Sequence, residues 1–297
     1  MIFAQNYQKP NHRMTATQAL KKIVQQLLDL YDPGEALSIA SIVLEDAFGI
    51  KTSQISTKIK LEAAQIAQLD GILQQLLKHE PVQYVMGQAA FYGYRFKVTP
   101  AVLIPRQETE ESVHWVLETC KQHPEIHSVL DIGTGSGCIP ISIKKRRPDL
   151  EVHALDVSPA ALEVAKENAE NLHAEVHFHE VNILEKKAWK ALPKFDLIVS
   201  NPPYVTEDER PILPKNVVDF EPHLALFAGG NDAQRFVKKI GEFGVQHLNP
   251  SGWLFLETNE FYVPISAQIL EGLGYKNVET RQDLNGRDRM ICGRRPF

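Results

Sequence analysis

The chain has 297 residues, of which 43% are hydrophobic and 23% charged, and its formal net charge at pH 7 is −5. This composition is typical of a soluble globular protein of one or two domains and excludes a disordered chain. An acidic total disfavours a protein that binds bulk DNA or RNA, since such proteins usually carry a basic surface. No stretch approaches the ~18 uncharged apolar residues of a membrane span, and the N-terminus has no apolar signal segment. The three cysteines lack the spacing of a metal site or a disulfide framework, so we expect a cytoplasmic protein.

Apolar residues repeat at three- and four-residue steps from about Thr15 to His79. This spacing predicts helices with one apolar face. The first helix ends before Pro33, the second runs through Ala47 and the third spans residues 61–77. We therefore predict a helical N-terminal domain over residues 1–80.

Residues 81–105 are rich in aromatic and β-branched residues with alternating polarity, which predicts a β-hairpin linker. From residue 106 onward a helix comes first, and short apolar strands then alternate with helices. The predicted strands are "SVLDIG", "EVHALDV", "AEVHFHEV", "FDLIVS" and "GWLFLET", followed by "NVETRQD" and "RMICGRR" in the tail. This alternation predicts an α/β domain over residues 106–297, with a largely parallel sheet covered by helices on both faces.

A glycine loop follows the first of these strands, in "VLDIGTGSGCIP". Glycines there let the backbone turn sharply and approach a ligand, next to the free N–H groups of a helix N-terminus. The spacing is GxGxG, whereas a dinucleotide fold prefers GxGxxG. Asp131 precedes the loop, and Asp156 ends the next strand, where a carboxylate can accept two hydrogen bonds from ribose hydroxyls.

Two acids around a glycine turn suit a ligand with a cationic amino-acid end and a nucleoside end, as in S-adenosylmethionine. The alternative is a tight strand–helix turn with an ordinary Asp cap. We predict cofactor binding by Asp131, Gly133, Thr134, Gly135, Ser136, Gly137 and Asp156.

The stretch "FDLIVSNPPY" ends a later strand, and ligands of open α/β sheets bind outside the carboxyl ends of strands. The side-chain oxygen of Asn201 and the carbonyl of Pro202 can each accept one N–H bond from a planar NH2 group. Tyr204 offers a ring face on which a planar amide or base can stack. We predict catalysis of methyl transfer by positioning and hydrogen bonding, without a strong general base. A plain Pro-Pro turn is the alternative.

These residues, together with several other stretches, resemble the HemK/PrmC family, N5-glutamine methyltransferases that modify the GGQ glutamine of peptide-chain release factors. The stretches are "PVQYVMGQAAFYGYRFKV", "LIPRQETE", "DIGTGSG", "ALDVSPAAL", "VSNPPY", "FEPHLALFAGG", "LNPSGWLFLE" and "LNGRDRM". The resemblance covers most of the chain. It implies a Rossmann-like class I S-adenosylmethionine-dependent methyltransferase domain after the helical domain and the hairpin linker.

For individual residues, the resemblance implies that the glycine loop and Asp156 bind the cofactor and that Ile183 packs near its adenine. It implies that Asn201 touches both cofactor and substrate, and that Pro202, Pro203 and Tyr204 contact the glutamine. It also implies that Arg106, Thr109 and Glu110 form part of a wall over the cofactor. The partner would be the GGQ domain of a release factor, and we expect the N-terminal domain and linker to hold it. The chain departs from the usual family pattern at Gln107, Glu108, Asn182, Ala233 and Asn259.

Two other functions stay open. An adenine-N6 DNA methyltransferase would share the NPPY motif, but the acidic charge and the lack of an obvious base-recognition domain disfavour a nucleic-acid substrate. A non-catalytic S-adenosylmethionine-binding scaffold would need a damaged acceptor site, whereas NPPY is intact.

His177 and His179 share one strand face but have no third ligand in view, so we predict no metal site. The basic run at 144–147 is typical of a solvated helix end.

Overall fold

The computed structural model describes residues 13–295, and the chain divides into two compact units, Met1–Gly87 and Gln88–Phe297. The first unit extends past residue 80, where the sequence placed the end of the helical domain. It includes a short helix, α4 (Val82–Met86), within the segment predicted as linker. Val82 is buried in the apolar core of the first unit, which explains why α4 belongs to it.

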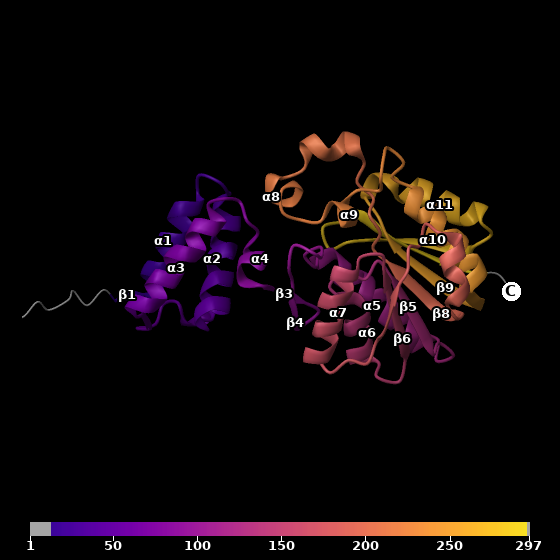
Figure 1. Ribbon diagram of the computed structural model, residues 1–297, viewed down its shortest axis with the longest axis horizontal. Coiled ribbons are helices and arrows are strands. Elements are labelled where there is room, and N and C mark those ends of the chain that lie inside the picture. Colours follow the sequence, from indigo (N-terminus) through magenta and orange to yellow (C-terminus); the bar gives the residue numbers. More distant parts are fainter. Residues whose placement is uncertain (1–12, 296–297) are drawn as a thin grey trace, which may run out of the picture. The chain divides into compact units, whose positions relative to one another are not determined.

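The first unit is a helical bundle, drawn in indigo and violet in Figure 1. Besides α4 it contains α1 (Ala16–Leu27), α2 (Pro33–Phe48) and α3 (Ala63–Leu76), a 3-10 turn η1 (Thr52–Gln54), and the paired strands β1 (Met14–Thr15) and β2 (Lys60–Leu61). Capping side chains define the helix starts: Thr15 accepts the N–H of Gln18, and Asp32 accepts that of Gly34. The three helices predicted from the apolar repeat are therefore confirmed.

The second unit is built on a sheet that has seven strands in the described residues, in the order β10-β11-β9-β8-β5-β6-β7. The strands are β5 (Ser128–Ile132), β6 (Glu151–Asp156), β7 (His177–Glu180), β8 (Phe195–Ser200), β9 (Leu248–Glu257), β10 (Lys276–Gln282) and β11 (Asp288–Arg294). Pairing is parallel from β7 to β9 and antiparallel at β11 and β10. The α/β fold with a mostly parallel sheet is thus confirmed, and all seven predicted strands are present.

Helices cover both faces of this sheet (Figure 1), and successive strand residues face opposite cores. On β5, Val129 packs in one core and Leu130 in the other. The first core holds residues of three helices, α5 (Gln107–Gln122), α6 (Cys138–Arg146) and α7 (Pro159–Asn171). The second holds residues of α10 (Arg235–His247), α11 (Val263–Gly272) and η2 (Lys186–Ala191). Shorter turns are η3 (Glu207–Ile212), α8 (Lys215–Val218), α9 (His223–Leu226) and η4 (Glu260–Tyr262).

The predicted hairpin consists of β3 (Gln88–Phe91) and β4 (Tyr94–Lys97), which pair antiparallel. Within the second unit, the hairpin is held to α7 by Asn168, whose side-chain oxygen accepts the backbone N–H of Lys97 at 2.7 Å. The amide nitrogen of Asn168 donates to the carbonyl of Lys97 and to that of Ser136 in the glycine loop, both at 2.9 Å. One buried amide therefore fixes both the hairpin end and the glycine loop.

The basic run at 144–147 is used inside the second unit. Lys144 donates to the carbonyls of Pro148 and Leu150, and Lys145 donates to that of Leu172. These bonds satisfy backbone carbonyls near helix ends, as expected for basic residues there. In the described part of the chain, none of the helices has the length and apolarity needed to cross a membrane.

Candidate functional site

A cavity of about 220 Å³ lies at the carboxyl ends of β5, β6 and β8 in the second unit. Its walls come from the loops after these strands and from two further segments, 101–103 and 222–225. Among the predicted site residues, it is lined by Gly133, Gly135, Asp156, Ile183, Asn201, Pro202 and Pro203. This is the position at which open parallel sheets bind ligands.

The glycine loop after β5 needs its glycines for two separate reasons. Gly135 has a φ of +54°, a conformation that residues with a side chain rarely adopt. Gly137 has a φ of +79°, and a Cβ there would lie 2.9 Å from the side chain of Ile141 and 3.2 Å from Ala165. The loop therefore lies against α6 and α7 and presents backbone to the cavity.

Asp131, the last but one residue of β5, lies beneath this loop and is fully buried. Neither of its carboxylate oxygens has a hydrogen-bond partner among the described residues. Burial raises the pKa of Asp131 to about 7, opposed by the neighbouring Thr134 hydroxyl and helped by the charge of Asp156. Thr134 and Ser136 are also buried, and their hydroxyl oxygens have no partner in the described part of the chain. Asp131, Thr134 and Ser136 do not themselves line the cavity, but they form a group of unpartnered buried polar side chains beside its wall at Gly133 and Gly135.

Asp156 closes the other side of the loop. One of its oxygens accepts the N–H of Gly135 and the other accepts the N–H of Ser158, both at 2.9 Å. Burial raises its pKa, although the backbone N–H groups of Ser158, Gly135 and Val157 oppose the shift. Each carboxylate oxygen can accept two bonds, so each keeps one acceptor position. Asp156 therefore braces the loop and can still bind hydroxyl groups.

Past β7 the cavity becomes apolar. Ile183 is 6% exposed and lines the wall with Leu155 and Val181. Its carbonyl accepts the indole N–H of Trp189 at 2.9 Å, which fixes the loop. An apolar wall of this kind can pack against a nucleobase.

Asn201 follows β8 directly, and two acceptors hold its amide. Its Nδ2 lies 3.0 Å from the Oγ1 of Thr109 and 3.0 Å from the Oε1 of Glu257. An unprotonated oxygen of Glu257 can only accept, whether the acid is ionised or carries its proton on the other oxygen, so the NH2 end of Asn201 faces the Oε1 of Glu257. The Oδ1 of Asn201 is consequently the end available to accept an N–H from a ligand.

Glu257 ends β9 and is 3% exposed. Burial raises its pKa to about 7, against the opposing effect of a Thr109 hydrogen bond. Its second oxygen lies 3.4 Å from the hydroxyl of Ser112 on α5. Two strand ends and one helix thus converge on the Asn201 amide.

The other three residues of the NPPY turn differ in burial and in whether they line the cavity. Pro202 is buried and Pro203 half-buried, and both line the cavity. Tyr204 is half-buried, does not line the cavity, and lies within electrostatic range of Glu257, Arg289 and Arg106. Burial and the charge of Glu257 raise the pKa of Tyr204 to about 12, so its hydroxyl is neutral near pH 7.

The three residues predicted to form a cofactor wall have different positions. Thr109 is buried against Asn201, as described above. Arg106 forms an ion pair with buried Glu221 at 2.5 Å, and Glu221 also accepts the N–H of Ile104 at 3.2 Å. This pair ties together the two segments, 101–103 and 222–225, that complete the cavity. Glu110 accepts the N–H of Tyr92 at 2.8 Å. None of the three, Arg106, Thr109 or Glu110, is among the residues lining the cavity.

Sequence reasoning did not single out Glu257, Glu221 or Asn168 as site residues. Each is a polar residue at least 95% buried, but only contacts with distant segments reveal that burial. One weak local signal marks Glu257, which is an acid that directly follows the apolar run "GWLFL". No comparable signal exists for Asn168 within α7.

The fold and the cavity define the class of protein, a Rossmann-like methyltransferase. Residues 95–219 match the family model of the methyltransferase small domain, and residues 18–87 match that of the PrmC N-terminal domain. The solved structure of a methyltransferase from Pyrococcus furiosus shares the fold, with a TM-score of 0.50 and 18% identity over 77% of this chain and 100% of that chain.

Two curated relatives identify the family. A release factor glutamine methyltransferase of Bacteroides thetaiotaomicron is 40% identical over 275 residues, 92% of this chain and 98% of the relative. One of Flavobacterium psychrophilum is 40% identical over 277 residues, 91% of this chain and 95% of the relative. The chain belongs to the release factor glutamine methyltransferase family.

Proposed function

We propose that this chain transfers the methyl group of S-adenosylmethionine to the side-chain amide nitrogen of the glutamine in the GGQ motif of peptide-chain release factors. The observation that carries the proposal is the Asn201 amide. Its NH2 end is held at 3.0 Å by Glu257 and by Thr109, on the wall of a cavity formed by the glycine loop. The curated relatives' name supports the choice of acceptor.

The residues present fit the cofactor. The unpartnered carboxylate of Asp131 is a buried charge site that a cationic group would stabilise, and Asp156 keeps two acceptor positions for ribose hydroxyls. The cavity wall at Ile183 is apolar, as an adenine ring requires. Bound S-adenosylmethionine would supply an electrophilic methyl group.

The chain's own groups would do the remaining work on the acceptor. A glutamine side-chain nitrogen is a poor nucleophile because its lone pair is delocalised into the amide. The Oδ1 of Asn201 and the carbonyl of Pro202 would each accept one of its N–H bonds and hold the nitrogen as it becomes tetrahedral. Once the nitrogen carries the methyl group, one of these two protons would leave to solvent. Rigid acceptors of this kind act by positioning and preorganised electrostatics, since Pro202 fixes its own φ near −65°. Tyr204, neutral near pH 7, would pack beside the planar amide.

Incubation of the full chain with tritiated S-adenosylmethionine and a purified release factor tests this proposal. Label should appear on the factor and should be lost when GGQ is changed to GGA, and unmethylated duplex DNA should stay unlabelled. Label on DNA would favour an adenine methyltransferase. Label on neither substrate, with cofactor binding confirmed by calorimetry, would contradict the proposal and support a scaffold.

A further inference from the structure

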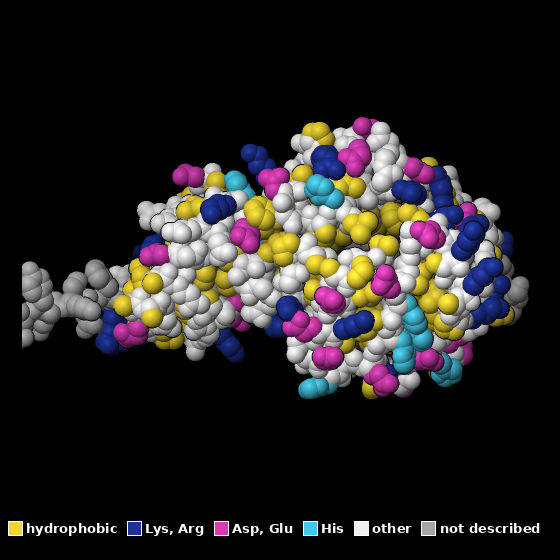
Figure 2. Space-filling model, in the orientation of Figure 1, with side chains coloured by type: hydrophobic (Ala, Val, Ile, Leu, Met, Phe, Trp, Pro, Cys, Tyr) yellow, Lys and Arg dark blue, Asp and Glu magenta, His cyan; other side chains and the backbone are white. Residues whose placement is uncertain are grey.

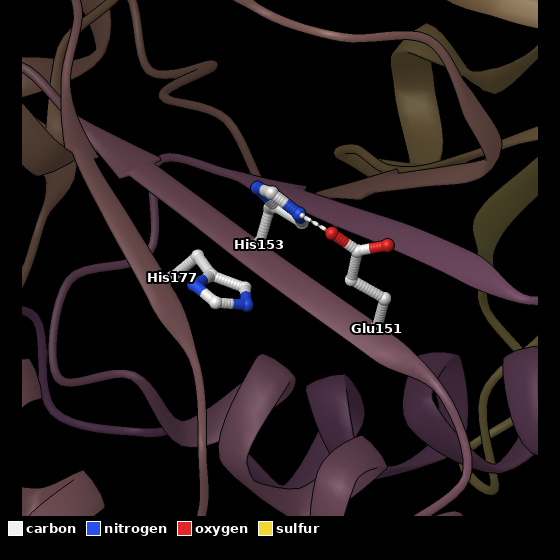
Figure 3. Close-up of side chains that lie close together, drawn as sticks. All are labelled: Glu151, His153 and His177. Atoms are coloured by element: carbon white, nitrogen blue, oxygen red, sulfur yellow. Dashed lines mark hydrogen bonds and ion pairs between the residues drawn. The ribbon is translucent and has the colours of Figure 1, made fainter.

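Three histidines and one acid gather on the edge of the sheet, outside the cavity. Glu151 and His153 belong to β6, and His177 and His179 belong to β7. His153 is the direct cross-strand partner of His177, and residues two apart on a strand share a face. Figure 3 shows the side chains of Glu151, His153 and His177 side by side on these two strands, and Figure 2 shows histidines gathered on the surface of the second unit.

The distances within this cluster suit a metal ion. The candidate ligand atoms of Glu151, His153 and His177 all lie within 4.8 Å of one another. Tetrahedral ligands at metal distances of ~2.0–2.2 Å are separated by about 3.3–3.5 Å. The Nε2 of His153 and the Oε1 of Glu151 are 2.9 Å apart, so a small rotation of the exposed Glu151 side chain is enough to open this gap.

The fourth side chain fixes the central ring. The Nδ1 of His153 lies 2.9 Å from the Nε2 of His179, and the two rings are almost parallel, with an interplanar angle of 3°. Metal-binding histidines usually donate their second ring N–H to a neighbouring acceptor, which sets the tautomer. If His153 donates from Nδ1 to His179, its Nε2 lone pair is directed toward Glu151.

We propose that Glu151, His153 and His177 bind a divalent first-row transition metal ion such as Zn²⁺ or Ni²⁺, with His179 orienting His153. Two imidazoles and one carboxylate are the ligand types that these ions take in proteins, with water completing the coordination. The ion binds the Nε2 of His153 only when that nitrogen carries no proton, so a proton held between His153 and Glu151 passes to solvent on binding. The sequence showed only His177 and His179; Glu151 and His153 join them through the pairing of β6 with β7.

A metal ion bound here would link the outer strand β7 to its neighbour β6. Among the strands of residues 13–295, β7 pairs only with β6, and the loop that follows β7 carries Asn182 and Ile183 to the cavity wall. A ligand on each strand would clamp β7 to β6. The expected consequence is a higher melting temperature of the metal-bound protein, since an ion that binds the folded state stabilises it.

Titration of the tag-free, chelator-treated full chain with ZnCl2 and with NiCl2, followed by calorimetry, tests the site. We expect one saturable site with a Kd below about 10 μM. His177→Ala and Glu151→Gln should each weaken binding at least tenfold while leaving the metal-free melting temperature and circular dichroism spectrum close to those of the wild type, because both side chains are exposed.

His114→Ala is the matched control, because His114 is an exposed histidine on α5, which packs on the opposite face of the sheet. Its affinity for both ions should equal that of the wild type. Absence of saturable binding up to about 1 mM would overturn the proposal. So would binding that His177→Ala and Glu151→Gln leave unchanged.

Discussion

Two buried carboxyl groups lie at opposite ends of the site, and they differ in their partners. Asp131 under the glycine loop and Glu257 behind the NPPY turn are 0% and 3% exposed, and burial raises the pKa of each to about 7. Asp131 has no hydrogen-bond partner in the described residues, whereas Glu257 accepts the NH2 of Asn201. Similar burial therefore supports two tasks: an unpartnered acid can stabilise a ligand's positive charge, and a partnered acid orients a side chain.

The largest expected effect is the pH dependence of stability that Asp131 confers. Its pKa is about 7 in the folded chain, above the ordinary value of 3.8, so between these values the folded state binds more protons than the unfolded state. Stability contributed by this group is present below pH 4 and is lost as the pH rises to about 7. The free energy of unfolding of the wild type should therefore fall, relative to that of Asp131→Asn, by roughly 3–4 kcal/mol over this window.

Urea unfolding of both proteins at several pH values, without cofactor, measures this difference. A constant difference from pH 4 to pH 7.5 would show that Asp131 is ionised in the folded protein throughout. Saturating S-adenosylmethionine should reduce the pH dependence of the stability difference between the wild type and Asp131→Asn. The corresponding difference between the wild type and Glu257→Gln, which changes from about pH 4.5 to 7, should stay the same with and without cofactor.

Asn201→Ala tests the partnered end of the site. Turnover on a release factor should drop by ~10²-fold or more, the scale seen when a hydrogen-bond partner of a transition state is removed. The affinity for S-adenosylmethionine, measured by calorimetry, should change little, because the glycine loop and Asp156 remain. Normal turnover in this variant would rule out the assigned role of the amide.

Asp156→Ala should affect the cofactor rather than the acceptor. The substitution removes the acceptor for the N–H groups of Gly135 and Ser158 and for the ribose hydroxyls. Cofactor binding should weaken by about 1–3 kcal/mol, the scale of hydrogen bonds to a charged group. If calorimetry gives the wild-type Kd, the assignment of Asp156 to the ribose is wrong.

The smallest expected effect comes from Glu257, which acts through Asn201. Glu257→Ala should lower kcat about tenfold, or about 1.4 kcal/mol, with an unchanged Kd for the cofactor. Glu257→Gln keeps an oxygen that can accept from the Asn201 NH2, so it should restore most of kcat. Equal losses in the two variants would mean that the negative charge, and not the orientation of the amide, matters.

Much of this molecule follows from local sequence patterns. Apolar residues at three- and four-residue steps determine α1 to α3, and short apolar runs between turn residues determine the strands. The glycines of the loop are set by backbone sterics alone, because φ values such as +54° at Gly135 exclude most other residues. The parallel order of the strands then places that loop and Asn201 at one edge of the sheet, as the sequence predicted.

The partners of these residues were decided by the tertiary structure. Glu257 lies 56 positions from Asn201, and Glu221 lies 115 from Arg106, so no local period connects them. Their roles, and the raised pKa of Glu257, depend on burial, which arises only when segments far apart in the chain exclude water together. The same holds for His153 and His177, which the register of β6 against β7 makes neighbours. Sequence determined which chemical groups are available, and packing determined which of them meet.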